Sequence, residues 1–464
     1  MRRPLPNMRI EKDFLGEKEV PKEAYWGVQT QRAIENFQIS GTRPHPMFIV
    51  ATAMVKKAAA LANMECGVLE KIRGRAVAKA ADEIISGKLH DQFRVDIYQA
   101  GAGTSHNMNA NEVIANRANE ILGGRKGDYS RVHPNDHVNY GQSTNDVFPT
   151  AMRIAALLLL EKFYPVLERA EKAFEAKAHA FRKIVKSGRT HLQDATPITL
   201  GQEFGGYAEA LRRCERFIRL AAGMLLAVGL GGSAVGTGIN TAKGYREKAV
   251  RHLRKISGLP VVPSENLFEA MQSMAPFSAL SGALRVLALE LGRIARDLRL
   301  LSSGPRTGFA EISLPELQPG SSIMPGKVNP VIAEMMEMVT FRVFGTDVAI
   351  GAAARAGDLE LNVMMPFIAA ALLETIALLK NALEAFTEKC ARGIKANEAR
   401  CRDFAEASVA NATALSPILG YERTAQVVRE ALDSGKSVRE VILGKKWMSP
   451  EKLDRALFGR GMRR

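Results

Sequence analysis

The sequence predicts an all-α protein built around a bundle of five long helices. Apolar residues recur over long stretches at the spacing of one helix face, and these stretches are rich in Ala, Leu, Glu, Lys and Arg, which favour helix. Segments of alternating polar and apolar residues bounded by turns, which indicate strands, are scarce. At 464 residues the chain is long enough that more than one domain is expected.

Each predicted helix is bounded by residues that have a chemical reason to end a helix. The five helices cover residues 150–184, 199–228, 277–301, 330–353 and 362–393. Gly229, Gly231 and Gly232 break the second helix, and Pro325 and Gly326 lie in a loop ahead of the fourth. The fifth helix is apolar around much of its circumference, which a helix on a monomer surface does not tolerate. We therefore expect it to be buried between subunits.

Cap signals predict a small helical unit near the C-terminus. Gly435 can end one helix, and Ser437 with Glu440 matches a capping box, in which each side chain accepts a hydrogen bond from the other residue's backbone N–H. Ser449 and Pro450 suit the cap and first turn of a further helix. The chain is therefore predicted to divide into a mainly helical N-terminal domain (1–142), a central bundle of long helices (143–395) and a small C-terminal helical domain (396–464).

Composition narrows the class of protein. Apolar residues make up 46% and charged residues 24% of the chain, as in a folded globular protein. The longest apolar run, residues 154–160, is too short to cross a bilayer, and residues 1–6 are not followed by the apolar region of a secretory signal. The 4 cysteines are scattered and are expected to be reduced, buried thiols. We therefore expect a cytoplasmic protein that does not contact membranes.

The charge of the chain bears on its partners. The net charge is +15, from 64 Lys and Arg against 49 Asp and Glu, which first suggests nucleic acid. However, basic residues are interleaved with acids, as in residues 293–299, and no basic stripe with interleaved aromatics occurs. We therefore expect no nucleic-acid partner, but a positive field that attracts small dianions. The sequence contains no cluster with metal-ligand spacing, so no metal is expected.

Two segments rich in small polar side chains lie ahead of predicted helices. In the first polar segment, residues 101–112, two glycines precede Thr104 and Ser105, so the backbone can approach a ligand closely. Thr104 or Ser105 could instead simply cap a helix. The second polar segment, residues 137–146, places short hydrogen-bond donors before a long helix, whose free N–H groups favour a carboxylate. An elaborate helix cap explains this second segment equally well.

Two further polar segments occur later in the chain. The third, residues 187–194, supplies His191, which titrates near neutrality, although a lone histidine is usually structural. The fourth, residues 318–330, contains enough Gly and Pro to predict a long loop. Its apolar centre is flanked by serines on one side and a lysine on the other, which favours a functional loop over a bland surface connection.

Within the fourth segment, residues 320–329 match the pattern GSSxxPxKxN throughout. This segment resembles the signature loop of the aspartase and fumarase superfamily. The other three polar segments resemble that family's remaining active-site segments in the same chain order, and residues 10–16 and 25–30 resemble the class that holds aspartases and class II fumarases. The resemblance covers essentially the whole chain. It implies an all-α, three-domain fold whose five-helix bundles assemble into one twenty-helix core in a homotetramer, with active sites that combine segments of several chains.

The resemblance also implies roles for individual residues. Ser321 would be the general base, acting as an oxyanion whose pKa is lowered by loop N–H groups and by the charge of Lys327. His191 would contact the carboxylate that becomes an enediolate, and Glu334 would pair with His191, although Glu334 also suits the dipole of its helix. The residues expected to bind the substrate are Thr104, Ser143, Thr144, Asn145, Thr190, His191, Ser322, Lys327 and Asn329. No metal or organic cofactor is implied.

Positions that vary within the superfamily favour the elimination of ammonia from L-aspartate, which yields fumarate. Residues 101–105 (GAGTS) and 142–146 (QSTND) resemble the aspartase form, as do residues 318–319, 359–364 and Val331. Against this, His191 and residues 195–197 also resemble fumarases. A class II fumarase, which interconverts L-malate and fumarate, is therefore the alternative.

Two more functions are possible but less favoured by the sequence. Argininosuccinate and adenylosuccinate lyases share the serine loop, but their first and third polar segments differ from those of this chain. A non-catalytic structural or binding protein derived from a lyase, comparable with a lens crystallin, is a distant possibility. The presence of Ser321, Lys327, Asn329 and His191 disfavours it.

Overall fold

A computed structural model describes residues 7–459 of the chain. Residues 1–6, on which the predicted lack of a secretory signal depends, lie outside the described residues. The last residues of the predicted C-terminal domain also lie outside them. The chain forms two compact units: unit 1 (Met1–Phe163, Arg216–Arg285 and Arg342–Leu378) and unit 2 (Tyr164–Glu215, Val286–Phe341 and Leu379–Arg464). The boundary between the two units falls within the long helices, so each of these helices contributes residues to both units. The predicted division into three sequence ranges therefore describes a different level of organisation and stays a prediction.

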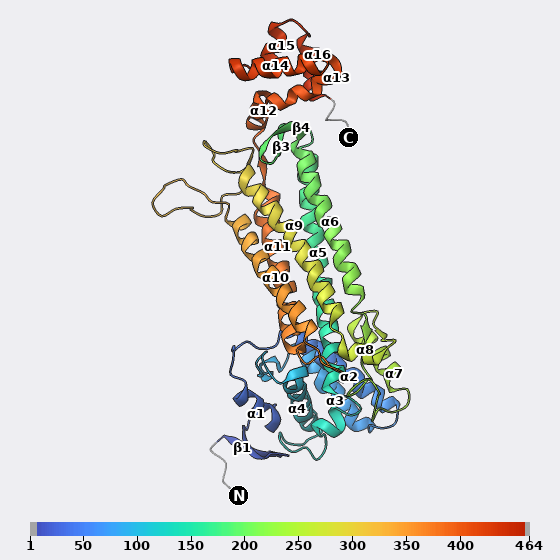
Figure 1. The fold of residues 1–464 in the computed structure, drawn as a ribbon. Coiled ribbons are helices and arrows are strands. Elements are labelled where there is room, and N and C mark those ends of the chain that lie inside the picture. The colour runs from blue at the N-terminus through green and yellow to red at the C-terminus, as the bar shows by residue number, and fades with distance from the viewer. Residues whose placement is uncertain (1–6, 460–464) are drawn as a thin grey trace. The chain divides into compact units, whose positions relative to one another are not determined.

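Five long helices supply the framework of both units, which confirms the predicted all-α class (Figure 1). They are α5 (Thr144–Ala180), α6 (Leu200–Gly223), α9 (Ala275–Leu301), α10 (Val331–Arg355) and α11 (Met365–Lys389). The predicted ends were less accurate than the helices themselves. Helix α5 begins at Thr144 rather than at residue 150 and continues through Pro149. Helix α6 ends at Gly223, before the glycines that were expected to end it.

Buried aromatic side chains join three of these helices within unit 2. The ring of Phe174 on α5 lies 6.2 Å from that of Phe204 on α6 and 6.1 Å from that of Phe386 on α11, and all three are fully buried. Helix α9 joins this group through Asp297, which accepts a 3.1 Å hydrogen bond from the hydroxyl of Tyr207 on α6. The burial of large apolar side chains, rather than helix propensity, therefore holds these helices side by side.

The N-terminal part of unit 1 packs short elements around a separate apolar core. Its elements are β1 (Met8–Asp13), β2 (Gly16–Pro21), α1 (Val28–Asn36), α2 (Pro46–Glu65), α3 (Lys71–Ile85), η1 (His90–Gln92), η2 (Gly101–Gly103), α4 (Thr104–Ile121) and η3 (Pro134–Val138). Strands β1 and β2 form an antiparallel hairpin. The core is built largely from small side chains of α2, α3 and α4, such as Ala60, Ala80 and Ala118, so these helices approach one another closely.

The motif at residues 25–30 has a structural explanation. The buried carboxylate of Glu112 on α4 accepts hydrogen bonds from the backbone N–H groups of Gly27, Gln29 and Thr30, at 2.8 to 3.1 Å, and so holds the start of α1. Burial raises the pKa of Glu112 to about 7. A Cβ atom at Gly27 would lie 2.7 Å from a carboxylate oxygen of Glu11 and 2.9 Å from Glu112. Gly27 is therefore required by close packing.

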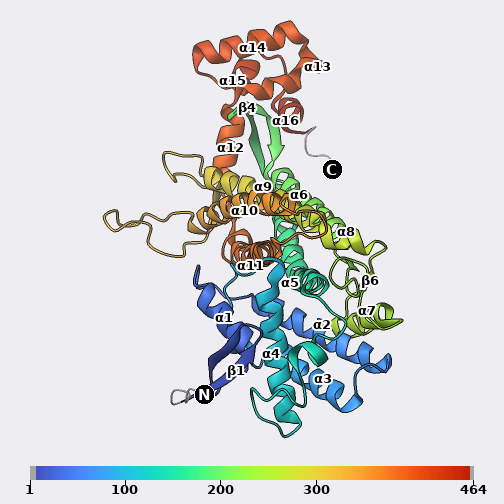
Figure 2. The ribbon, with the colours of Figure 1, turned by 60° about the horizontal axis from the view of Figure 1, so that its bottom comes forward.

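The remaining elements are short. They are β3 (Val185–Thr190), β4 (Gln193–Thr199), β5 (Ala227–Val228), α7 (Tyr245–Ser257), β6 (Val262–Pro263), α8 (Leu267–Gln272), β7 (Ile312–Ser313), η4 (Ala391–Gly393), β8 (Lys395–Ala396), α12 (Glu398–Ala407), η5 (Val409–Leu415), α13 (Ser416–Leu419), α14 (Tyr421–Ser434), α15 (Val438–Gly444) and α16 (Pro450–Phe458). Strands β3 and β4 form an antiparallel hairpin that contacts α12 within unit 2 (Figures 1 and 2). This hairpin was not predicted from the sequence.

The predicted caps near the C-terminus are confirmed. Gly435 ends α14 with a left-handed backbone, at φ +69°. The Ser437 side chain accepts from the backbone of Glu440, whose carboxylate accepts in return from the Ser437 N–H at 2.8 Å. Ser449 caps α16, and Pro450 is its first residue. Local sequence signals are sufficient here because a cap involves only a few consecutive residues.

Burial within the chain explains the apolar composition of helices α2 and α11. Helix α2 and the segment Met365–Gly393, which contains α11, are long and apolar enough to cross a membrane, but 72% and 61% of an apolar 18-residue window in each are buried inside the protein. Core helices pass the same test. The apolar character of α11 is therefore no evidence for the subunit interface predicted from it, because residues of its own chain cover most of this helix.

The packing at Gly27 leads to a stability prediction. We expect Gly27→Ala to lower the free energy of unfolding by about 1–3 kcal/mol, because overpacking at this site displaces buried carboxylates. Chemical denaturation followed by circular dichroism measures the change. The control is Gly444→Ala, since a Cβ atom at Gly444 meets nothing within 4 Å. Equal stability of the two variants would contradict the assignment.

Candidate active site

The fourth polar segment forms a long loop in unit 2 that is tied at its base. The Gly320 N–H donates to the Lys327 carbonyl at 2.6 Å, and the Asn329 side-chain amide donates to the Gly320 carbonyl at 2.8 Å. A Cβ atom at Gly320 would lie 2.7 Å from the Lys327 carbonyl oxygen. Only glycine allows this close approach of backbones. Residues 321–326 are therefore held as a loop whose two ends meet.

Two backbone donors converge on the hydroxyl of Ser321 inside this loop. Its Oγ atom accepts from the N–H of Met324 at 3.0 Å and from the N–H of Ile323 at 3.2 Å. Hydrogen bonds of this kind stabilise an alkoxide more than a neutral hydroxyl. Ser321 is only partly buried, so its hydroxyl is open to a small molecule. The arrangement therefore suits a serine that gains negative charge during a reaction.

A cavity of about 1040 Å³ lies beside the base of the loop in unit 2. Its lining includes Lys327, Asn329 and Glu334, together with Arg296 and Arg299 of α9. Four cationic side chains line the cavity (Arg296, Arg299, Lys327 and Lys395), against three acidic ones (Glu316, Glu334 and Glu337). Because Arg299 pairs with Glu337, the lining has only a small excess of positive charge. Ser321 and Ser322 do not line this cavity, because the loop extends away from α10 (Figure 1). The structure thus brings three of the predicted site residues together and leaves the two serines on the exposed part of the loop.

Thr190 and His191 lie at the tip of the hairpin formed by β3 and β4. The strands are joined by the two residues His191 and Leu192, which have φ values of +57° and +60°. Residues other than glycine rarely adopt this left-handed conformation, and strain of this kind is concentrated at functional sites. Both side chains are exposed at the tip. Among the described residues of this chain, no hydrogen bond or ion pair joins His191 to Glu334, the predicted partner.

A buried ionic network fixes the hairpin to the rest of unit 2. The carboxylate of Glu311, which is fully buried, lies 2.9 Å from Lys186 and 2.9 Å from Arg189, both on β3. Glu203 of α6 contacts Lys186 at 2.8 Å, and burial raises the pKa of this carboxyl. Such a network gives the exposed tip a rigid base. These residues were not predicted from the sequence, because their ion pairs link positions far apart in the chain.

The first polar segment starts α4 in unit 1, but not through the predicted caps. The residue that caps α4 is Gly103, with φ +85°, and neither Thr104 nor Ser105 caps it with a side chain. The prediction that one of them serves as the N-cap was therefore wrong. The ring of Phe148 occupies the space where a Cβ atom of residue 103 would lie. The Thr104 side chain is exposed and remains open to a ligand.

The second polar segment forms the start of α5 in unit 1. The Ser143 Oγ atom accepts from the N–H of Asn145 at 3.2 Å, and Asp146 accepts from the N–H of Ser143 at 2.9 Å. The Asn145 side-chain amide donates to the carbonyl of Ala234 at 2.8 Å. Ser143 and Asn145 are partly buried, and Thr144 is buried. The segment therefore caps the helix, as one interpretation of the sequence expected, while its binding of a carboxylate stays a prediction.

A glycine-rich turn that was not predicted supports the second polar segment. The second carboxylate oxygen of Asp146 accepts from the N–H groups of Gly231 and Ser233, at 2.9 and 3.1 Å. From the sequence, these glycines indicated only the end of a helix. The high density of glycines between residues 229 and 238 could have indicated this turn from the sequence, because glycine permits the close approach of backbones that the turn shows.

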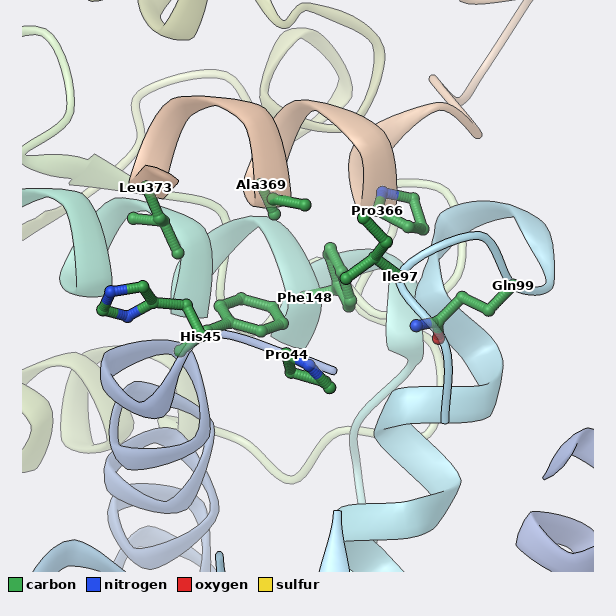
Figure 3. Close-up of a pocket in the computed structure, with 10 residues that line it drawn as sticks. Pro44, His45, Ile97, Gln99, Phe148, Pro366, Ala369 and Leu373 are labelled. Carbon is green, nitrogen blue, oxygen red and sulfur yellow. The ribbon is translucent and has the colours of Figure 1, made fainter. Parts of the chain in front are cut away.

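The cavity in Figure 3 is a poor candidate for a substrate site. It lies in unit 1 between Phe48, Phe148, Ile97 and Leu373, with Pro44 and Pro366 nearby, and its volume is about 20 Å³. This space is comparable to that of one water molecule. A four-carbon dicarboxylate does not fit. Among residues 7–459, no three His, Cys, Asp or Glu side chains gather closely enough to hold a metal ion.

Comparison with known proteins places this fold and these segments in one class. The family model described as "Lyase" matches residues 16–345, and that described as "Fumarase C C-terminus" matches residues 412–462. The chain therefore belongs to the lyase family. It is 51% identical to an aspartate ammonia-lyase of Bacillus subtilis (strain 168), over 96% of this chain and 94% of the relative.

Solved structures agree with this result. A fumarate lyase:delta crystallin from Brucella melitensis bound to cobalt is 49% identical, with a TM-score of 0.95 over 97% of this chain and 98% of the other. A class II fumarase from Schistosoma mansoni is 36% identical, with a TM-score of 0.92 over 97% and 98%. The predicted superfamily is confirmed, as is the predicted class of enzyme, an ammonia-lyase.

The network around Glu311 leads to a second stability prediction. We expect Glu311→Ala to lower the free energy of unfolding by about 3–5 kcal/mol, because it leaves the largely buried Arg189 without its carboxylate partner and the buried Lys186 with Glu203 alone. The midpoint of thermal unfolding measures this loss. The control is Glu398→Ala, since Glu398 pairs with Arg402 on the surface, with both side chains more than half exposed. A change in Glu311→Ala no larger than in the control would refute the role of the network.

Proposed function

We propose that the chain catalyses the reversible deamination of L-aspartate to fumarate and ammonia, with Ser321 as the general base. The observation that carries the mechanism is the pair of backbone N–H groups that converge on the Ser321 hydroxyl oxygen. About half of the residues are identical to those of aspartate ammonia-lyases over nearly the whole chain, which supports the choice of substrate. The anti elimination proceeds through an enediolate, a dianionic form of the carboxylate next to the carbon that loses its proton.

The chemistry assigns a task to each group of site residues. Ser321, as an alkoxide, removes the proton from the carbon adjacent to one carboxylate, and the donors around that carboxylate stabilise the charge that develops. We assign these donors to Thr190, His191 and Ser322, with Lys327 and Asn329. Thr104, Ser143, Thr144 and Asn145 bind the other carboxylate and the amine. Collapse of the enediolate breaks the carbon–nitrogen bond and expels the protonated amine as ammonia. Ser321 then releases the proton that it took from carbon to solvent, which restores the alkoxide.

We further propose a homotetramer in which several chains complete each active site. Helix α10 supports this assembly, because Met338, Phe341 and Val348 are 67%, 65% and 73% exposed and are spaced along one face of the helix. The hairpin tip with His191 is exposed in a single chain, as an element that contacts a neighbour would be. In such an assembly His191 and Glu334 pair across subunits. Cytoplasmic localisation is also proposed, since all four cysteines are free thiols, with Cys66 only partly buried.

The substrate is tested by absorbance in the fumarate band. We expect purified protein to release fumarate from L-aspartate but not from L-malate, because the second polar segment matches the form found in aspartases. Ammonia release in the same reaction is the control for the carbon–nitrogen cleavage. Fumarate from L-malate alone would move the assignment to a class II fumarase, and fumarate from neither would favour a non-catalytic protein.

The general base is tested by Ser321→Ala. We expect kcat to fall by roughly 10²–10⁴-fold, which is the usual contribution of a positioned general base. Ser257→Ala is the matched control, because the Ser257 hydroxyl donates to the carbonyl of Leu253 within α7, and Ser257 belongs neither to the loop nor to the lining of its cavity. Light scattering on both variants establishes that the assembly is intact. A Ser321→Ala enzyme with near-parental kcat and the parental mass would rule out Ser321 as the base.

A further inference from the structure

Lys56 of α2 is an ionisable side chain that the proposed mechanism does not use. It is fully buried, in a helix that otherwise consists largely of small apolar residues. Burial lowers the pKa of its ammonium group to about 7. Keeping a lysine at such a position costs stability unless specific partners compensate for the lost hydration. The contacts of Lys56 therefore indicate what it contributes.

Both hydrogen-bond partners of Lys56 belong to the second polar segment. The ammonium group donates to the side-chain oxygen of Asn139 at 2.8 Å and to that of Gln142 at 3.1 Å. The same Asn139 oxygen accepts from Asn107 and Asn111 of the first polar segment, at 3.3 and 3.2 Å. One buried cation thus lies where the two polar segments of unit 1 meet.

These contacts lead directly to the residues assigned to the substrate. The Asn139 side chain donates to the backbone carbonyl of Gln142, and Ser143 is the next residue in the chain. A second buried polar residue of α2, Asn63, donates to the carbonyl of Tyr140 at 2.9 Å. Helix α2 therefore holds the backbone just ahead of Ser143 at two points. A displacement of Lys56 would be transmitted through two hydrogen bonds to the start of α5.

Lys56 also balances a buried carboxylate. Asp146 accepts the backbone bonds that join the start of α5 to the glycine-rich turn. Burial raises the pKa of Asp146 to about 6, and the charge of Lys56 acts in the opposite direction. The other ionisable groups near the pair stay neutral: burial lowers the pKa of His106 to about 3 and raises that of Tyr245 well above its usual value.

We propose that Lys56 is a positioning residue for substrate binding, which sets Asn139 and Gln142 and balances Asp146 so that residues 143–145 present their donors to a substrate carboxylate. The inference rests on the proposed function, because it takes residues 143–145 as substrate ligands. A purely structural Lys56 would affect stability alone, whereas a positioning residue also affects substrate affinity and its pH dependence when it is replaced.

The test is Lys56→Met, which retains most of the bulk of the side chain but removes its charge and donors. We expect KM for L-aspartate to rise roughly tenfold or more while kcat changes by less than about threefold, because a binding contact shared by ground and transition states acts on KM. The acid limb of kcat/KM should also move to higher pH. Without the nearby cation, Asp146 takes up its proton at a higher pH and then cannot accept all of its backbone bonds.

The matched control is Lys57→Met, on the next residue of the same helix. Lys57 pairs with Asp82 at 2.6 Å, and Asp82 is about half exposed. We expect this variant to keep the parental KM and acid limb, since such pairs contribute little. The proposal is overturned if folded Lys56→Met keeps the parental KM and acid limb.

A second variant keeps the proposal testable if Lys56→Met does not fold. Gln142→Met leaves the charge in place but removes one of its two acceptors, and we expect KM to rise by about threefold or more. A parental KM in Gln142→Met would overturn the proposal. Ser143→Ala separates the two levels of inference: a raised KM supports residue 143 as a substrate ligand whatever the result at Lys56, whereas an unchanged KM contradicts the proposed function itself.

Discussion

The carboxylate of Asp146 is the interaction on which the polar part of unit 1 depends. Its two oxygens accept three backbone hydrogen bonds, from the start of α5 and from the glycine-rich turn that follows α6. A side chain at the first turn of a helix thereby brings together segments that are 85 residues apart in sequence. The cost is a buried negative charge, which the fold compensates with backbone dipoles and with Lys56. Long helices supply the scaffold, but this carboxylate determines how their ends meet.

Other interior charges follow the same rule. Glu112 is surrounded by backbone N–H groups, and Glu311 lies between Lys186 and Arg189. Each of these groups joins elements that come from different parts of the chain: α4 with α1, and β3 with the segment before β7. In a protein made of helices, apolar burial brings elements together with little angular precision, whereas a buried charge must find specific donors. The buried ions therefore define positions that the apolar cores leave open.

Sequence patterns predicted local structure and the family, but not the contacts between distant segments. The five long helices and the caps at Ser437 and Ser449 were correct, because periodicity and capping involve neighbouring residues. The expected side-chain cap of α4 was wrong. Gly103, whose backbone is left-handed and which packs against the ring of Phe148, caps this helix instead. In the candidate site, the loop with Ser321 was identified from its composition and motif. Partners such as Glu311 could not be identified, because nothing near them in the sequence specifies which residues they meet.

The closed base of the loop at residues 320–329 divides it into two kinds of position. Gly320 and Asn329 are constrained by the geometry of closure, as they form the hydrogen bonds that bring the ends of the loop together. Ile323 and Met324 contribute only backbone N–H groups to Ser321, and their side chains are exposed. Side chains between the ends can therefore be exchanged without opening the base or removing the donors to the serine. For enzyme redesign, residues 323 and 324 are therefore positions whose side chains can be varied while the Ser321 oxygen keeps its two backbone donors.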